Sequence, residues 1–244
     1  MQNNKQIVPY SHPVKDISYK TPKSPTNATK KVLTELKNSW NNCGFLDDRG
    51  QIWIELTKLH SILRTNKSNA NYYAAEIKEE NKMYINNKTY IIGYEVVKLM
   101  DRFIQNEKSG STKSMYLQYS EMIYHAIRDC AESQKLRTAY QTMLNENRKK
   151  LKLKRIRKYK IKFDELTGES LNKKDSDFSH IRSFAIFKDI GDKIENGLIV
   201  NHSTHLQITK AGVNDEEELL KLCKKNSWKT DWYDKYLDFL KTVE

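Results

Sequence analysis

The alternation of apolar and polar positions divides the first hundred residues into short elements. Apolar residues recur at steps of three and four, the spacing of an amphipathic helix, in residues 27–40, 52–63 and 68–80. Residues 82–93, "KMYINNKTYIIG", instead place residues of high β-propensity on both sides of Asn86-Asn87. This pair tolerates positive φ and predicts a hairpin turn. Helix, turn, helix and β-hairpin is the order of a winged helix-turn-helix.

A helical pattern continues through the middle of the chain. Residues 95–105 form one amphipathic segment, and neither proline nor glycine interrupts the stretch between Ser111 and Asp164. The polar stretch "NEKSGSTKS" at residues 106–114 is a linker by composition. After it we expect one long bridging helix. The end of this stretch, residues 148–162, fits either a helix that ends near Lys154 or a strand that leads into the next domain.

The composition of the chain predicts an N-terminal arm and a division into domains. All four prolines fall within the first 25 residues, among Asn, Ser, Thr and Lys, which predicts a flexible arm. The predicted fold class is α+β, mainly helical, with an N-terminal helix-turn-helix and β-hairpin, a long bridging helix, and a C-terminal module with two trailing helices. The expected segments are the arm (1–27), a winged-helix-like domain (28–108), the long helix with a basic tract (109–162) and the C-terminal domain (163–244).

The charge is concentrated in one place. The chain carries 43 Lys and Arg against 31 Asp and Glu, a net charge of +12. The run "RKKLKLKRIRKYKIK" at 148–162 holds ten of the basic residues and no acidic one. Such a density of like charge favours contact with a nucleic-acid backbone, because released counterions drive binding. The residues expected to contact DNA here are Lys150, Lys152, Lys154, Arg155, Arg157, Lys158 and Lys160.

The second predicted helix offers another candidate DNA contact. In a helix-turn-helix, the second helix enters the major groove. Its first turns here carry Lys67, Asn69 and Asn71, whose side chains can meet phosphates or base edges. Tyr72 and Tyr73 fit either DNA contact or core packing.

Other features limit the class of protein. No run of about 18 apolar residues exists, so we expect no membrane span and a cytoplasmic protein. The three cysteines include no CxxC pair, which excludes a zinc knuckle of the usual spacing and suits buried thiols in a reducing compartment.

The C-terminal region resembles the HNH nuclease family, which has the ββα-metal fold. The matching features are "LTG" in a first turn, "SHI" after a β-type run, Asn-Gly before the apolar "LIV", and a histidine at the start of a short helix. His180, Asn196 and His205 follow in the family's order, over roughly residues 164–212. The resemblance implies a DNA endonuclease of phage, mobile-element or restriction type.

The resemblance also implies a role for each residue of the site. His180 would act as general base, Asn196 would orient its imidazole, and His205 would bind a divalent metal. Asp177, on the preceding strand, is a second candidate ligand, and His202 or Asp175 a further one. The expected cofactor is one Mg²⁺ or Mn²⁺ ion per site, and the expected partner is double-stranded DNA, bound by a monomer or a homodimer.

Two positions depart from the family pattern. Ser179 stands where Asp or His usually precedes the general base, and Thr209 stands where some members have another ligand one turn after His205. These departures keep a second hypothesis open. The chain would then be a non-enzymatic DNA-binding regulator that carries a degenerate HNH fold.

Overall fold

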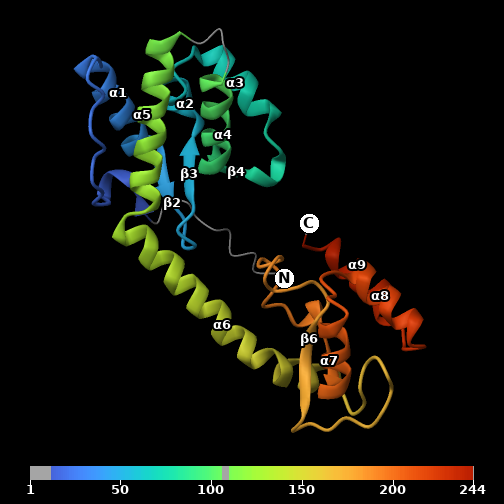
Figure 1. Ribbon diagram of the computed structural model, residues 1–244. Coiled ribbons are helices and arrows are strands. Elements are labelled where there is room, and N and C mark those ends of the chain that lie inside the picture. Colours follow the sequence, from blue (N-terminus) through green and yellow to red (C-terminus); the bar gives the residue numbers. More distant parts are fainter. Residues whose placement is uncertain (1–11, 106–109, 244) are drawn as a thin grey trace. The chain divides into compact units, whose positions relative to one another are not determined.

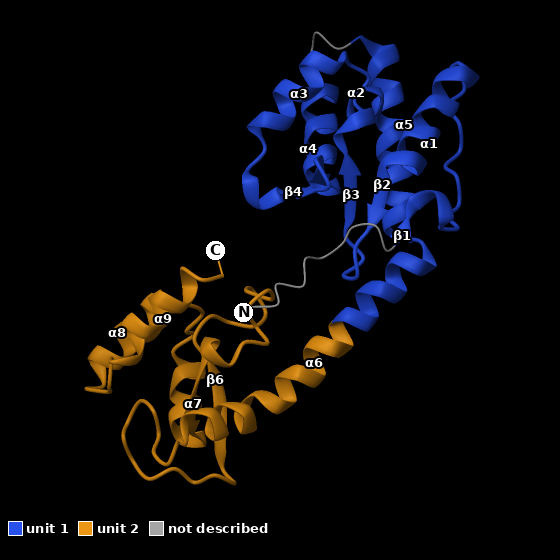
Figure 2. Ribbon diagram, turned by 180° about the vertical axis from the view of Figure 1, so that it is seen from behind, with its two compact units in different colours: residues 1–140 blue, residues 141–244 orange. Residues whose placement is uncertain are grey.

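The chain folds into two compact units, residues 1–140 and 141–244, in a computed structural model that describes residues 12–105 and 110–243 (Figure 2). The fold is α+β and mostly helical, as expected. Helix α6 (Ala131–Tyr159) begins in the first unit and ends in the second. The division between the units therefore falls inside the segment 109–162.

A five-stranded antiparallel sheet organises the first unit. Its strands follow the order β1 (His12–Pro13), β2 (Gly44–Leu46), β3 (Ile52–Glu55), β5 (Lys88–Ile92) and β4 (Lys82–Ile85). The helices that gather around it are α1 (Lys30–Cys43), α2 (Leu59–Ile62), α3 (Lys67–Glu76), α4 (Gly93–Ile104) and α5 (Ser111–Arg128) (Figure 1). Trp40, Ile54 and Leu117 are fully buried in the core between them.

The hairpin prediction is confirmed. Strands β4 and β5 pair in register from Lys82 opposite Ile91 to Ile85 opposite Lys88. Asn86 and Asn87 between them have φ values of 48° and 60°, the positive values that a two-residue turn requires.

The prediction of a helix over residues 52–63 is wrong for its first half. All four residues of β3 are buried, and the strand pairs with β2 on one side and β5 on the other. A helix forms only at α2, after a 3₁₀ turn at Leu56–Lys58. Apolar residues on both faces of a central strand can match helical spacing, and here pairing within the sheet decides the conformation.

The flexible-arm prediction is wrong for the part of the arm that the structure describes. His12 and Pro13 pair with β2, and Val14 in the following 3₁₀ turn (Val14–Asp16) is fully buried. Ile17 and Tyr19 also pack against the core. The first eleven residues of the predicted arm lie outside the described residues.

The single long helix is also a wrong prediction. The chain breaks at Asp129 and Cys130 between α5 and α6, where the Ser133 hydroxyl donates to the carbonyl of Ile127 at 2.6 Å. Neither alternative for the basic run holds, because α6 continues past Lys154 to Tyr159 as a helix.

The second unit is built on a two-stranded antiparallel hairpin. Strand β6 (Ser176–His180) pairs with β7 (Gly197–Asn201), and a 3₁₀ turn at Ile194–Asn196 leads into β7. The helices that follow are α7 (His202–Lys210), α8 (Glu216–Lys225) and α9 (Trp232–Leu240). Their apolar faces form a second core around Leu198, Val200 and Trp232.

No helix within the described residues combines the length and the apolar composition that crossing a membrane requires.

Candidate functional site

His180 lies at the end of β6 with its imidazole held in one orientation. Its Nε2 lies 2.9 Å from the carbonyl oxygen of Gly191. A carbonyl only accepts, so Nε2 carries the proton and Nδ1 carries the lone pair. The rings of Phe178 and Phe184 contact the imidazole at centroid distances of 5.0 and 5.9 Å. The protein thus selects one tautomer of His180.

The surroundings of His180 favour its neutral form. Burial is the main cause that lowers its pKa below the usual 6.5, and the charges of Arg148 and His205 lower the pKa further. The hydrogen bond to Gly191 acts in the opposite direction but is outweighed. His180 is therefore uncharged at neutral pH, and its Nδ1 is able to accept a proton.

A second cluster joins β6 to the first turn of α7. The Asp177 Oδ2 atom lies 2.7 Å from Nδ1 of His202 and 3.0 Å from Nδ1 of His205. The two histidines are three positions apart, so they share one face of the helix. Partial burial disfavours the Asp177 carboxylate, but the hydrogen bonds from both histidines outweigh it and lower its pKa. The hydrogen bond to Asp177 raises the pKa of His202.

In these contacts Asp177 is the hydrogen-bond partner of both histidines. When each Nδ1 donates to the carboxylate, the Nε2 atoms of His202 and His205 keep their lone pairs. A carboxylate that orients an imidazole in this way is the usual outer partner of a metal-binding histidine. We expected Asp177 as a ligand, whereas its Oδ2 is used by both imidazoles.

The donor set suits a divalent ion that accepts nitrogen ligands and keeps open positions, because two oriented imidazoles are nitrogen donors, whereas Mg²⁺ prefers oxygen ligands. Within residues 12–105 and 110–243, no group of three or more His, Cys, Asp or Glu side chains has the arrangement of a complete ion site. In this cluster the Nε2 atoms of His202 and His205 are the nitrogen atoms left available to an ion, and Asp177 orients both imidazoles.

Asn196 has a different set of contacts from the one expected. Its side chain is fully buried and binds the backbone of Arg182, accepting from N at 3.0 Å and donating to O at 3.1 Å. The Tyr236 hydroxyl also donates to it, at 2.7 Å. The expected contact with the imidazole of His180 is made by the Gly191 carbonyl instead. Asn196 fixes the backbone two residues beyond His180.

Both departures from the family pattern lie next to the cluster. Ser179 is only 3% exposed, so its hydroxyl is covered by the fold. Thr209 donates its hydroxyl to the carbonyl of His205 at 3.0 Å, a bond within α7. Neither side chain is placed to complete an ion site.

The basic run divides into two groups. Arg155 is buried and binds both carboxylate oxygens of Glu165, at 2.8 and 2.7 Å. Lys152 donates to the carbonyl of Ser176, and Lys158 pairs with Glu195 at 2.8 Å. These three cations, expected as DNA contacts, serve the fold. The other expected residues are exposed and have no ion-pair partner in the described part of the chain: Lys150, Lys154, Arg157 and Lys160.

The candidate contacts in the first unit are exposed positions of α3. Lys67, Asn69 and Asn71 are exposed, and the helix is capped by the Asn66 side chain, which accepts from the Asn69 amide. The Tyr72–Tyr73 pair divides: Tyr72 is 65% exposed, whereas Tyr73 packs on Phe103 at a ring distance of 4.8 Å.

Sequence reasoning missed two contributors to the environment of His180. The Gly191 carbonyl is a backbone atom, and its place next to the imidazole has no sequence signal. Arg148 was counted only as part of the basic run, but its guanidinium lies 4.9 Å above the ring of Phe184, beside His180.

Comparison of the chain with protein-family models, with curated proteins and with solved structures finds no match.

Proposed function

We propose that the protein is a metal-dependent DNA endonuclease whose second unit hydrolyses phosphodiester bonds, with a fold of the HNH, or ββα-metal, type. The observation that carries this proposal is the imidazole of His180. It is neutral because burial lowers its pKa, and its tautomer is set by the Gly191 carbonyl. A general base and a cluster of oriented histidines thus lie on one hairpin-helix module.

The chain's own groups account for activation of a water molecule. Nδ1 of His180 accepts the proton of a water that attacks the phosphorus, while Nε2 keeps its proton on the Gly191 carbonyl. The rings of Phe178 and Phe184 keep the imidazole from rotating. After the transfer, the imidazolium is still held by the same carbonyl.

The proposed cofactor is one divalent ion held by His205 and His202, and of the two expected ions their nitrogen ligands favour Mn²⁺ over Mg²⁺, which prefers oxygen ligands. A bound ion would neutralise charge on the scissile phosphate and on the leaving oxygen. Asp177 holds both imidazoles in the orientation that leaves each Nε2 available.

The exposed cations of α6 supply the contact with the DNA backbone. Lys150, Lys154 and Arg157 are spaced by four and three residues, so they form one stripe on the helix. We call these three residues the basic stripe. Double-stranded DNA is the proposed substrate, bound also through Lys67, Asn69 and Asn71 of a winged-helix-like first unit. A homodimer on a palindromic site and a phage, mobile-element or restriction origin belong to the same proposal.

One observation favours a second candidate function. Ser179 is buried and Thr209 bonds within its own helix, so neither adds a ligand to the two histidines. A site that binds metal weakly would leave a DNA-binding regulator that carries the fold without cleavage.

Incubation of the full chain with supercoiled plasmid in Mg²⁺, Mn²⁺ or EDTA distinguishes the two functions. The enzyme is expected to nick or cut the plasmid in a divalent ion, to stop in EDTA, and to lose cleavage but keep DNA affinity in His180→Ala. His12→Ala is the matched control, because His12 lies in the first unit on β1. Intact plasmid in every lane, with a gel shift that wild type and His180→Ala share on several plasmids, contradicts the endonuclease and supports the regulator.

A further inference from the structure

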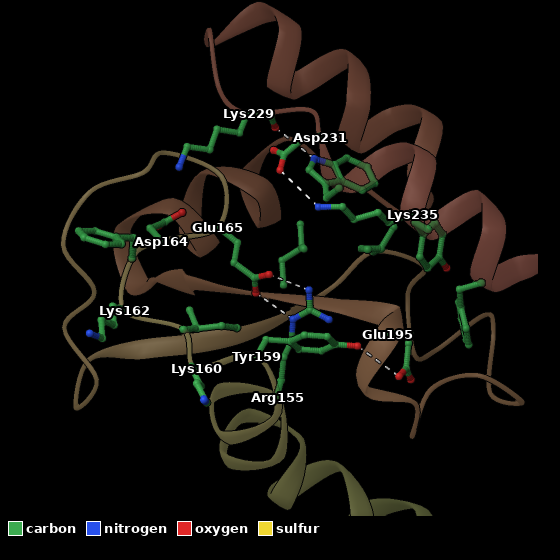
Figure 3. Close-up of a pocket in the computed structure, with 17 residues that line it drawn as sticks. Arg155, Tyr159, Lys160, Lys162, Asp164, Glu165, Glu195, Lys229, Asp231 and Lys235 are labelled. Atoms are coloured by element: carbon green, nitrogen blue, oxygen red, sulfur yellow. Dashed lines mark hydrogen bonds and ion pairs between the residues drawn. The ribbon is translucent and has the colours of Figure 1, made fainter.

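A pocket of about 520 Å³ opens on the second unit (Figure 3). Its walls come from the end of α6, the segment 160–165, the turn before β7, and the start of α9. Ile181, the residue that follows His180, also lines it. Volumes of this order accommodate a ligand of nucleotide size.

The acidic side chains of this pocket are neutralised within the protein. Glu165 pairs with Arg155, Asp231 lies 3.7 Å from Lys235, and Glu195 binds Lys158. The dashed lines of Figure 3 mark the first two of these pairs. The pocket therefore offers no free acid from these three residues.

Asp164, the remaining acid, is fully buried and accepts four hydrogen bonds. One oxygen accepts from the amides of Leu166 and Thr167, and the other accepts from the amide of Asn201 and the hydroxyl of Thr204. Its carboxylate is thus satisfied by groups of the protein itself.

Three lysines at the pocket remain uncompensated. Lys160, Lys162 and Lys229 are exposed, and none has an ion-pair partner among the residues that the structure describes. In Figure 3 Lys162 and Lys229 lie on the side of the pocket opposite Glu195, and Lys160 lies below them, close to Tyr159. Three cations on one rim favour an anionic ligand that reaches all of them, such as successive phosphates of a strand.

The position of Lys229 is set by contacts with residues 166–168. The amide of Lys229 donates to the carbonyl of Leu166 at 2.8 Å. Its side chain lies over Gly168, where Nζ is 2.9 Å from the position that a Cβ would occupy. Gly168 has a φ of +76°, so this turn favours glycine for its backbone as well. The ammonium group is thus held at the rim.

An aromatic side chain accompanies the lysines. Phe163 lies between Lys162 and Asp164 in sequence, lines the pocket, and is 56% exposed. Its backbone is fixed by a bridge to Ser170. No ring or cation contacts Phe163 within the described ranges, whereas the nearby Tyr159 is covered by Arg155 at 5.0 Å. Phe163 therefore presents a free face on which a base can stack.

We propose that this pocket binds single-stranded nucleic acid: one unpaired base stacks on Phe163, and the flanking phosphates contact Lys160, Lys162 and Lys229. A base inside a duplex is already stacked and does not enter a concave pocket, whereas an unpaired base does so without that cost. The inference rests on the proposed function for its substrate class, and Ile181, which lines the pocket, directly follows the general base in the chain. The occupant is an unpaired part of the DNA strand.

Fluorescence anisotropy of the full chain with a labelled oligothymidine, in EDTA so that no cleavage occurs, tests the proposal. Phe163→Ala is expected to weaken binding about tenfold, and Phe163→Tyr is expected to keep it. Ile186→Ala is the control, because Ile186 is 61% exposed and does not line the pocket. An abasic strand is expected to bind wild type and Phe163→Ala equally, since it has no base to stack.

The role of the three pocket lysines is tested by removing their charge. Changing Lys160, Lys162 and Lys229 together to Gln is expected to reduce the slope of log affinity against log salt by about 2, from about 0.7 for each phosphate contact. The matched control changes three exposed lysines of α8 in the same way: Lys221, Lys224 and Lys225.

Two results overturn the proposal: an unchanged affinity in Phe163→Ala, or equal salt slopes for the two lysine triples. Either result leaves the plasmid assay of His180→Ala unaffected. Loss of oligothymidine binding in the pocket variants of a protein that never cleaves would sustain the pocket and refute the endonuclease. The two proposals therefore fail independently.

Discussion

Replacing Arg155 by methionine is expected to destabilise the second unit by about 3 kcal/mol. The residue is 9% exposed, and its guanidinium binds both oxygens of Glu165 and the carbonyl of Ile194, the latter at 2.7 Å. Removing one partner of a buried pair costs about 3–5 kcal/mol. The lower end applies because the Glu165 side chain is 22% exposed and water screens its charge in part. Methionine keeps most of the apolar stem of Arg155 in place.

Urea unfolding of the full chain measures this loss as a shift of the midpoint at constant slope. Hydrogen exchange of β7 localises it, because the Ile199 amide donates to Glu165 at 2.7 Å and is expected to exchange faster in Arg155→Met. The control is Lys154→Met, whose exposed side chain is expected to change stability by no more than about 0.5 kcal/mol.

DNA binding of the same two variants separates a structural cation from a DNA contact. Lys154→Met is expected to reduce the salt slope by about 0.9, the value for one phosphate on duplex DNA, and Arg155→Met is expected to leave it unchanged. Equal urea midpoints for the two variants would refute the structural role of Arg155. A lower salt slope in Arg155→Met would instead show that Arg155 contacts the DNA backbone.

Three further predictions concern the site and the basic stripe. Because the pKa of His180 is lowered on folding, mainly by burial, the unfolded chain binds more protons below pH 6.5. The free energy of unfolding should thus rise with pH up to about 6.5, and urea midpoints should show a smaller rise in His180→Gln. Gly191→Ala places a methyl group 2.8 Å from Cε2 of Phe184, which should displace the carbonyl that holds the imidazole; plasmid cleavage should fall about tenfold or more at unchanged DNA affinity. Changing all three cations of the basic stripe to Gln should lower the duplex salt slope by about 3, measured by anisotropy.

Local chemistry explains which elements could be predicted from the sequence. The turn at Asn86 and Asn87 needs only residues that accept positive φ, so the hairpin is visible in the chain itself. Strand β3 is defined by pairing with β2 and with β5, which follows more than thirty residues later. That pairing is non-local, and the apolar spacing alone is equally consistent with a helix.

The break between α5 and α6 has a similar explanation. No proline or glycine marks it, and the chain leaves the helix at Asp129 without any strong helix-breaking residue. The Ser133 hydroxyl donates to the Ile127 carbonyl, which also accepts from the Cys130 amide at 3.4 Å, the shorter spacing of a 3₁₀ turn. Serine competes with the backbone in this way at many positions, so its presence in the sequence does not predict where a helix ends.

The helical period of α6 separates the cations of the basic run onto a buried face and an exposed face. Leu151 and Arg155 lie four residues apart on the face that α6 buries, while Lys150, Lys154 and Arg157 face solvent. The sequence shows the number of cations but leaves open their angular positions, because a strand and a helix both fit it. Once the segment is a helix, its period of 3.6 residues divides the cations into those that contact the second unit and those that face solvent.

The order His180, Asn196, His205 predicts which residues lie in one module, but it does not fix their partners. Asn196 joins the Arg182 backbone to the Tyr236 hydroxyl, so the fold needs this amide whether or not the site cleaves DNA. The orientation of the base depends on the Gly191 carbonyl, which any residue could supply if the space beside Phe184 allowed it. An enzyme and a binding protein of this fold would therefore share the asparagine. They would differ in whether Nδ1 of His180 meets water next to a phosphate, and cleavage by wild type against His180→Ala measures that difference.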